Sequence, residues 1–375
     1  MGILPFSNAE YSQRLDKIKN QMVQEGLDAL ILTRAQNIYW VAGYRAAAMN
    51  WTLPLLPLII TQKGEMRFMT RVIECSAAET QLAPNPRFYK DHEDHYAILA
   101  ELVEDCGVAT GAIGVEEAFM TVFQFKQMKS ALPRADLKNA SWLVENIRIA
   151  LSEQEVAYYR KAAEMTNIGF KKGLELIRAG LYPYEIIAEI QHAMYQAGQS
   201  DVEVPKMWIW SGPKGGYMHD TAVNRRLNAN DIATVEVWGT ECQYLAGAQA
   251  TVFLGEKPNS EVLDAHKLVR DMYLAAKAAL KPGAISGDTY QAASNVYRAA
   301  KGQDYWRRVG ANLGLSFGPV DMGMTGQYVI EPWTPFILQI VEVEPALVTC
   351  CSTLLVTDTG CEELTAPHLE MRCIP

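Results

Sequence analysis

The sequence predicts an α+β protein with two domains, and three observations lead to this fold class. The chain has 375 residues, which is more than a single hydrophobic core normally supports. Hydrophobic residues make up 49% and charged residues 21%, a composition typical of a soluble globular protein. Near residue 149, short strands and helices give way to long amphipathic helices followed by long apolar strands. We therefore expect an α/β domain over residues 1–148 and, over residues 149–375, a curved antiparallel sheet covered by helices on one face.

In the first domain, residues 9–25 predict an amphipathic helix that ends at Gly26. Its apolar face is formed by Tyr11, Leu15, Ile18 and Met22. Residues 29–33 (ALILT) are typical of a buried strand. Residues 57–61 (PLIIT) and 66–70 (MRFMT), separated by QKGE, predict a hairpin. Together these elements indicate a small α/β domain.

The second domain begins with a long amphipathic helix for which Ser152 is the expected N-cap. Glu153 and Glu155 lie in its first turn, where acidic side chains interact favourably with the helix dipole, and Gly180 is its expected end. The remaining elements follow in order: a helix at 184–198, strands at 206–212, 232–238 and 243–255, helices at 260–280 and about 286–300, and strands at 336–345 and 349–360. We expect the last two strands to pair antiparallel.

Charge and cysteine usage limit the partners and the compartment. The net charge of −9 leaves no basic surplus to neutralise phosphates, which argues against a nucleic-acid partner. No apolar stretch is long enough to span a membrane, and the N-terminus lacks the pattern of a signal peptide. The seven cysteines are odd in number and scattered, as expected for a reducing cytoplasm. Cys350 and Cys351 should point to opposite faces of a strand as buried free thiols.

Two acids stand in apolar surroundings of the second domain. Glu236 lies in the middle of the strand segment IATVEVW, and Glu344 lies in VEVEPAL. A glutamate is rarely buried without a partner, so we interpret both as site residues. Glu342 should share a face with Glu344, so that one of these two could be a structural acid. With His219 upstream, the acids provide the elements of general acid–base catalysis. The alternative interpretation is a buried ion-pair network without function.

From Ser211 to Thr365, the order and spacing of several landmarks resemble the pita-bread family, which includes methionine aminopeptidase, aminopeptidase P, prolidase and creatinase. The landmarks are the Ser-Gly-Pro turn before His219, the Gly-Thr after the Glu236 strand, the Gly-Leu of NLGLS, Glu344-Pro345 and the terminal VTDTGCEELT. The resemblance implies a C-terminal pita-bread domain preceded by a small creatinase-like domain. It also implies that His219 lies at the mouth of the pocket.

The metal ligands of this family are mostly replaced in the present chain. Metal-dependent members use two Asp, one His and two Glu, and the matching positions here are Glu236, Gly247, Ala311, Glu344 and Cys351. Glycine and alanine side chains have no donor atom. The resemblance therefore implies that a two-metal site cannot form, and we expect neither a metal nor another cofactor.

Within the family, the chain most resembles the metal-free ectoine hydrolase and creatinase, through NIYWVAGY, VEVWGT and NLGLSFGPVDMG. This resemblance implies that His219, Glu236 and Glu344 are the catalytic residues. Gln249 matches a creatinase glutamate that holds the amidine group, and here it would orient the substrate. The arginines with which creatinase binds its substrate carboxylate have no counterpart near Trp51 or around Asp321.

Several aromatic residues are candidates for substrate binding. Trp208 and Trp210 should share one strand face that leads into the histidine loop, and Tyr244 begins the strand that follows Glu236. A planar cation over such a ring would be attracted by the π-face. We interpret the run DHEDH as a solvated loop rather than a metal site. Relatives of this kind are homodimers in which the small domain reaches the other chain's pocket, so Trp51 and His95 are expected to contact substrate in trans.

We therefore expect a metal-independent hydrolase that acts on a non-peptide C–N bond in a small amidine, guanidine or cyclic amide. Glu236 would either attack the substrate carbon or act as acid and base, and the sequence leaves both open. One alternative is a lyase or cyclase that uses the same pocket without water. Another is a non-catalytic binding protein on the same scaffold, and a peptidase with a single metal is a further possibility.

Overall fold

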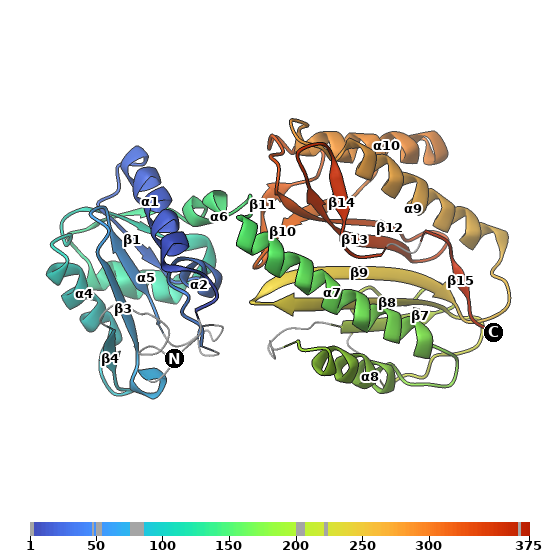
Figure 1. Cartoon of the computed structure of the whole chain (residues 1–375), viewed down its shortest axis with the longest axis horizontal. Coiled ribbons are helices and arrows are strands. Elements are labelled where there is room, and N and C mark those ends of the chain that lie inside the picture. The colour runs from blue at the N-terminus through green and yellow to red at the C-terminus, as the bar shows by residue number, and fades with distance from the viewer. Residues whose placement is uncertain are drawn as a thin grey trace. The chain divides into compact units, whose positions relative to one another are not determined.

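A computed structural model describes residues 4–46, 49, 55–75, 86–199, 207–220, 224–366 and 369–375 of the chain. The chain separates into two compact units, Met1–Arg148 and Ile149–Pro375 (Figure 1). Each combines helices with a β-sheet, and the C-terminal sheet is largely antiparallel. The predicted α+β fold class is confirmed.

The N-terminal unit is built on a six-stranded sheet in the order β4-β3-β2-β1-β5-β6. The predicted hairpin is present as the antiparallel pair β2 and β3, whereas β1 pairs in parallel with β5. Its elements are α1 Asn8–Gln24, β1 Ala29–Leu32, α2 Ala35–Ala42, β2 Leu58–Thr61, β3 Met66–Arg71, η2 Val72–Glu74, β4 Arg87–Tyr89, α4 His95–Asp105, β5 Ala112–Val115, η3 Glu117–Phe119, α5 Val122–Ala131, β6 Asp136–Asn139 and α6 Leu143–Ile147.

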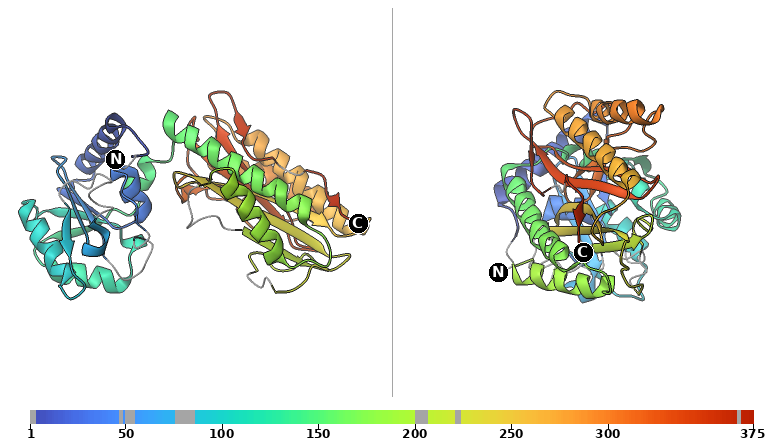
Figure 2. Two further views of the ribbon diagram at one scale, coloured as in Figure 1. Left: turned by 60° about the horizontal axis from the view of Figure 1, so that its bottom comes forward. Right: turned by 90° about the vertical axis from the view of Figure 1, so that its right-hand side faces the viewer.

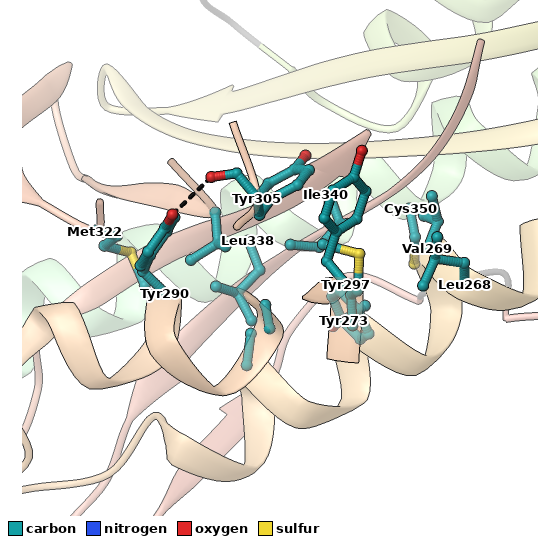
Figure 3. Close-up of a cluster of buried hydrophobic side chains, with 14 of the residues drawn as sticks. Leu268, Val269, Tyr273, Tyr290, Tyr297, Tyr305, Met322, Leu338, Ile340 and Cys350 are labelled. Atoms are coloured by element: carbon teal, nitrogen blue, oxygen red, sulfur yellow. Dashed lines mark hydrogen bonds between the residues drawn. The ribbon is translucent and has the colours of Figure 1, made fainter. Parts of the chain in front are cut away.

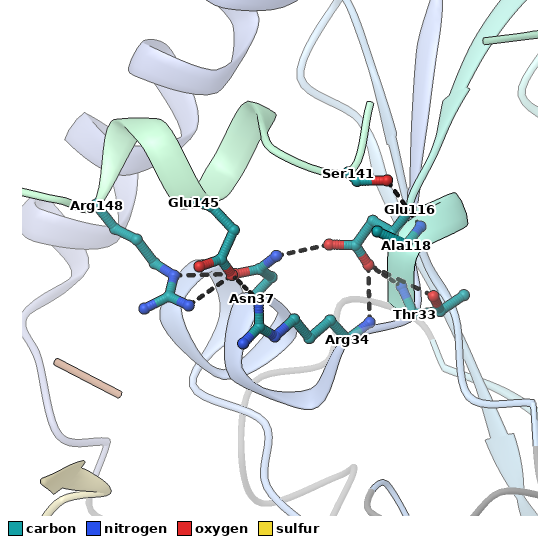
Figure 4. A network of polar contacts seen from close by, with 8 residues as sticks. All are labelled: Thr33, Arg34, Asn37, Glu116, Ala118, Ser141, Glu145 and Arg148. Carbon is teal, nitrogen blue, oxygen red and sulfur yellow. Dashed lines mark hydrogen bonds and ion pairs between the residues drawn. The ribbon is translucent and has the colours of Figure 1, made fainter. Parts of the chain in front are cut away.

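A buried polar network ties α2 to α6, the last helix of this unit (Figure 4). Glu116 accepts hydrogen bonds from the Arg34 backbone N–H at 2.7 Å and from Asn37 Nδ2 at 2.6 Å. Glu145 pairs with both Arg34 at 2.7 Å and Arg148 at 2.5 Å. Because buried charges are costly unless they are paired, this network strongly favours one position of α6 on the unit.

The C-terminal unit contains a nine-stranded sheet whose main path is β11-β10-β12-β13-β9-β8-β7, with β14 on β13 and β15 on β9. Its elements are α7 Glu153–Leu176, α8 Pro183–Gln196, β7 Met207–Gly212, β8 Ile232–Glu241, β9 Tyr244–Phe253, α9 Ser260–Ala279, α10 Ser286–Lys301, β10 Gly310–Leu313, β11 Phe317–Asp321, β12 Pro335–Glu342, β13 Val348–Val356, β14 Cys361–Glu363 and β15 Arg372–Cys373.

The first of these helices starts as predicted but ends earlier. Ser152 caps α7 through a capping box with Glu155, in which each side chain binds the other's backbone N–H. The helix ends at Leu176, before the predicted Gly180, because Ile177 already has extended backbone angles. The predicted strand at 336–345 likewise ends early, at Glu342.

Alternate residues of the central strands face the helices, which cover one side of the sheet (Figures 1 and 2). Val235 and Val237 of β8 and Ala248 and Ala250 of β9 form a core with α7 and α8. Ala250 is paired across the sheet with Cys350 of β13, so both project from the same face. Helices α7 and α8 therefore lie on the face from which Cys350 also projects.

The second part of that helical layer is the core under α9 and α10 (Figure 3). Leu338 and Ile340 of β12 pack there with Tyr273 of α9, and Cys350 joins them. The Tyr290 hydroxyl of α10 is buried and donates to the Tyr305 carbonyl at 2.6 Å, so its polar end is satisfied.

All seven cysteines are free thiols. Cys351 packs with Trp238 on the face opposite to Cys350, so the predicted opposite orientation of these two buried thiols is confirmed. Within the described ranges, no helix combines the length and the apolar character that crossing a membrane requires.

Helix α7 approaches strand β8 closely at Gly239. Its N–H donates to Thr166 Oγ1 at 2.9 Å, and a Cβ at this position would lie 2.6 Å from the Thr166 backbone N and 2.7 Å from the Ala162 carbonyl O. Because these are backbone atoms of a helix, they cannot move aside locally.

We expect Gly239→Ala to lower the free energy of unfolding by about 1–3 kcal/mol, as overpacking does. Denaturant titration followed by circular dichroism measures the loss. Gly360→Ala is the matched control, since a Cβ there meets no atom within 4 Å, and it should change stability by less than about 0.5 kcal/mol. Equal effects of the two substitutions would show that the α7–β8 contact is not tight.

Candidate active site

The helix-free face of the sheet carries a row of side chains from five neighbouring strands. Residues opposite one another in paired strands project from the same face. The row runs from β7 to β12 through Trp208, Glu236, Gln249, Cys351 and Gln339. Strand pairing thus brings together predicted site residues that are far apart in the sequence.

Glu236 lies at the centre of this row, and only 1% of its side chain is exposed. Its Oε1 accepts a hydrogen bond from Trp238 Nε1 at 2.5 Å. Its Oε2 has no hydrogen-bond partner in the described part of the chain and lies 3.6 Å from His219 Nε2. Burial raises the pKa of Glu236 from 4.5 to about 7, although the Trp238 N–H, the Gln249 amide and the Arg307 charge oppose the shift.

His219 reaches Glu236 from a loop whose backbone is left-handed at three positions. Gly215 and Gly216 have φ values of 86° and 70°, and His219 itself has φ 59°. Such a backbone costs a non-glycine residue about 1–3 kcal/mol, and residues of this kind gather at functional sites. The His219 ring contacts those of Trp208 and Trp210, with centroids 5.3 and 6.0 Å away.

The protonation states of the pair follow from its surroundings. Partial burial, followed by the positive charge of Arg307, lowers the pKa of His219 below its usual 6.5. His219 is therefore neutral at pH 7, where Glu236 is close to half protonated. A neutral imidazole beside a carboxylic acid with a near-neutral pKa can accept one proton and donate another.

Arg307 is a site residue that the sequence analysis missed. Its guanidinium donates to the carbonyl O of Gln339 at 3.1 Å and also to Gln339 Oε1. No carboxylate of the described residues lies within ion-pair distance of it, although its charge affects the pKa values of His219, Glu236 and Cys351. The Arg-Arg pair at 307–308 is the available signal in the sequence, whereas the resemblance to creatinase points to positions near Trp51 and Asp321.

Three buried polar atoms on this face have no hydrogen-bond partner among the residues described: Trp210 Nε1, Glu236 Oε2 and Gln249 Nε2. Gln249 is held at its other end, where Oε1 accepts from Thr349 Oγ1 at 2.9 Å. Trp210 and Gln249 are each only 1% exposed. Because most buried polar groups are paired in native proteins, a cluster of orphaned atoms beside His219 indicates a ligand site.

The five positions that the family resemblance matches to metal ligands do not fit a two-metal centre. Gly247 and Ala311 contribute no donor, and a Cβ at Gly247 would lie 2.8 Å from the Trp238 ring, which therefore fills the space above it. Burial raises the pKa of the Cys351 thiol well above its usual range. Across the described ranges, no group of three or more His, Cys, Asp or Glu side chains is placed to hold a metal ion.

The expectation that Glu344 is a strand-buried acid is wrong. Strand β12 ends at Glu342, and Glu344 is exposed in the following turn. Glu342 is the buried acid, and its Oε1 accepts the N–H groups of Val343 and Glu344 at 2.8 and 3.1 Å. Its Oε2 lies 3.4 Å from Lys301 Nζ of α10. Glu342 therefore stabilises the turn, which is the structural role that the sequence left open for one of these two acids.

Another predicted binding residue, Tyr244, is not part of this cluster, and two more belong to the N-terminal unit in the sequence. Tyr244 is buried and donates to Glu155 of α7 at 2.5 Å, so it lies toward the helices and not on the face of Glu236. His95 begins α4 in the N-terminal unit, where its ring stacks with that of Tyr89 at 5.6 Å. Trp51 lies outside the described residues.

Comparisons with known families agree with this fold. The profile described as Metallopeptidase family M24 matches residues 157–337, and that described as Creatinase/Prolidase N-terminal domain matches residues 14–150. The chain belongs to the M24 family of hydrolases, which has the pita-bread fold.

Individual relatives are distant but similar over most of the chain. An uncharacterized hydrolase/peptidase of Sinorhizobium fredii is 26% identical over 99% of both chains. The creatinase of a Bacillus species is 23% identical over 78% of this chain and 72% of its own. The crystal structure of a prolidase from Thermococcus sibiricus superposes with a TM-score of 0.88 at 18% identity, covering 98% of this chain and 100% of that one. The last likeness concerns the fold alone.

The raised pKa of Glu236 predicts how stability depends on pH. Between pH 4.5 and about 7 the unfolded chain releases this proton while the folded chain retains it, so stability falls as pH rises through this window. The loss is about 3 kcal/mol by pH 8. We expect Glu236→Gln to be more stable than wild type at pH 8 and to lose that advantage at pH 4.5.

Denaturant titrations at several pH values measure this difference. Glu256→Gln, a substitution of an exposed acid in the same unit, should give a difference that does not vary with pH. If the stability difference between Glu236→Gln and wild type were also independent of pH, the raised pKa of Glu236 would be contradicted.

A separate prediction follows from the hydrogen bond that Trp238 donates to Glu236. Trp238→Phe keeps a ring above Gly247 but removes the N–H that stabilises the Glu236 carboxylate. We expect the pKa of Glu236 to rise further, by about one unit, which moves the pH window of the stability loss upward. Trp142→Phe, in the N-terminal unit, is the control and should leave the window unchanged.

Proposed function

We propose that this M24-family chain is a metal-independent hydrolase that cleaves a non-peptide C–N bond in a small amidine, guanidine or cyclic amide. The observation that carries the proposal is the His219–Glu236 pair, 3.6 Å apart, on a face where two positions that the family resemblance matches to metal ligands, Gly247 and Ala311, have no donor atom. Similarity to creatinase supports the same class of reaction.

The protonation states support an acid–base mechanism. Neutral His219 accepts a proton from water as the water oxygen attacks the substrate carbon. Protonated Glu236 gives its proton to the nitrogen that leaves when the C–N bond breaks. His219 is then cationic and Glu236 anionic, and proton transfer across the gap between Nε2 and Oε2 restores both groups. Direct attack by the Glu236 carboxylate on the carbon is the covalent variant of this mechanism.

The surrounding residues have binding roles in this proposal. Trp208 and Trp210 enclose the substrate beside His219, and Gln249 orients it. Glu344 is proposed as a substrate contact at the rim, because it is exposed in the turn after β12. We further propose a cytoplasmic homodimer in which Trp51 or His95 reaches the partner's site, and the seven free thiols support a reducing compartment.

A lyase or cyclase is the second candidate. The water-excluding rings of Trp208 and Trp210 favour it, because chemistry without hydrolysis needs a dry site. The mass of the product separates the two candidates, since hydrolysis adds one water to the substrate and a lyase or cyclase does not. A protein that binds a small molecule without turnover would give no product at all.

The acid–base pair predicts a bell-shaped dependence of kcat/KM on pH. The acid limb reports protonation of His219 below pH 6.5, and the alkaline limb reports deprotonation of Glu236 near pH 7, as apparent values of the coupled pair. His219→Asn, which tolerates the left-handed backbone, and Glu236→Gln should each lower kcat by about 10²- to 10⁴-fold.

His192→Asn and Glu256→Gln change exposed residues of the same unit and should leave kcat unchanged. Turnover should also survive prolonged treatment with a chelator, and elemental analysis should find no stoichiometric metal. Full activity in both site variants, or its loss on chelation, would refute the mechanism.

A further inference from the structure

We infer that the site prefers a substrate whose reacting carbon bears a carbonyl oxygen. Such a substrate is a neutral or anionic amide or urea, and it is preferred over the cationic amidine or guanidine of the same shape. The inference rests on the proposed function, because it identifies the chemical class that enters the same pocket. It depends on which polar atoms of the pocket lack partners and on the charge that the pocket carries.

The orphaned atoms are mainly donors. Gln249 Nε2 and Trp210 Nε1 can only donate hydrogen bonds, and Glu236 Oε2 is the single acceptor beside them without a partner within hydrogen-bond distance among the residues that the structure describes. Gln249 Nε2 carries two hydrogens, so its interaction with the Glu236 carboxyl, which opposes the rise in that group's pKa, leaves one of them for a ligand. A carbonyl oxygen accepts hydrogen bonds and can therefore satisfy a donor of this site, while the N–H of an amide can donate to Glu236. An amidinium has donors alone, so it would leave Gln249 and Trp210 buried and unsatisfied, which disfavours its binding.

The orientation of the Gln249 amide is set by its neighbour. Thr349 Oγ1 lies 2.9 Å from Gln249 Oε1 on the adjacent strand β13, so the carbonyl end of this side chain is occupied. The amide nitrogen is therefore the end left for the ligand. Thr349 acts here as a positioning residue, because it contacts Gln249 and is itself fully buried.

The charge of the pocket points in the same direction. Arg307 is partly buried, bound only to the uncharged Gln339, and its guanidinium has no carboxylate within ion-pair distance in the described ranges. The positive charge of Arg307 already acts on Glu236, where it favours the ionised carboxylate. A second cation would be repelled by Arg307, whereas a carbonyl oxygen that gains negative charge during attack by water is stabilised by it.

Two isosteric pairs of probes test the inference directly. N-carbamoylglycine and guanidinoacetate differ only in the exchange of a carbonyl oxygen for a charged amino group, and 2-pyrrolidinone and 2-iminopyrrolidine make the same exchange in a ring. Binding of each to the full-length wild-type protein is measured by titration calorimetry and by the shift in Tm. We expect the carbonyl member of each pair to bind at least about tenfold more tightly.

Gln249→Glu replaces the orphaned donor by an acceptor of the same shape and should reverse the preference in favour of the amidinium member. Arg307→Gln should weaken the binding of N-carbamoylglycine, which carries a carboxylate, more than the binding of 2-pyrrolidinone. Preferential binding of either amidinium by the wild type, or no binding of the carbonyl probes at millimolar concentration, would overturn the inference. If the carbonyl probes bind preferentially but no compound of this class is hydrolysed, the proposed hydrolase function is refuted while the inferred binding preference is upheld.

Discussion

The register of the C-terminal sheet is the constraint on which the rest of this molecule depends. Because side chains alternate between faces, a shift of one residue between β8 and β9 would exchange the core for the site. The pairing of Glu236 with Gln249 places both on the helix-free face, while Val235 and Val237 pack under α7 and α8. The helical layer thus packs against the opposite face of the sheet and fixes the position of the site residues without contributing to their chemistry.

One tryptophan joins the packing of the site to its chemistry. At Gly247, which the family resemblance matches to a metal ligand, the Trp238 ring fills the space that a side chain would need. The same indole donates a hydrogen bond to Glu236, so it both fills this space and holds the carboxyl group in place. The missing side chain at position 247 and the placement of the Glu236 carboxyl are therefore parts of one arrangement.

The sequence predicted the parts of the structure that depend on local periodicity. Trp208 and Trp210 could be assigned to one face because an alternating pattern fixes orientation along a strand, whereas their shared face with Glu236 emerges only from strand pairing. The position of Glu344 could not be predicted, since strand ends depend on turn geometry and the strand stops two residues earlier. The role of Arg307 could not be predicted either, because this residue precedes β10 and reaches the site through its contact with Gln339, which only the tertiary structure reveals.

The indole above Gly247 also bears on how this lineage can change. A carboxylate ligand introduced at that position would collide with Trp238, and removing Trp238 first would take a hydrogen bond from Glu236. Either change made alone therefore disturbs a contact of the other residue. In evolutionary terms, the packing of Trp238 against Gly247 couples the two positions, so that substitutions at one must be compatible with the residue at the other.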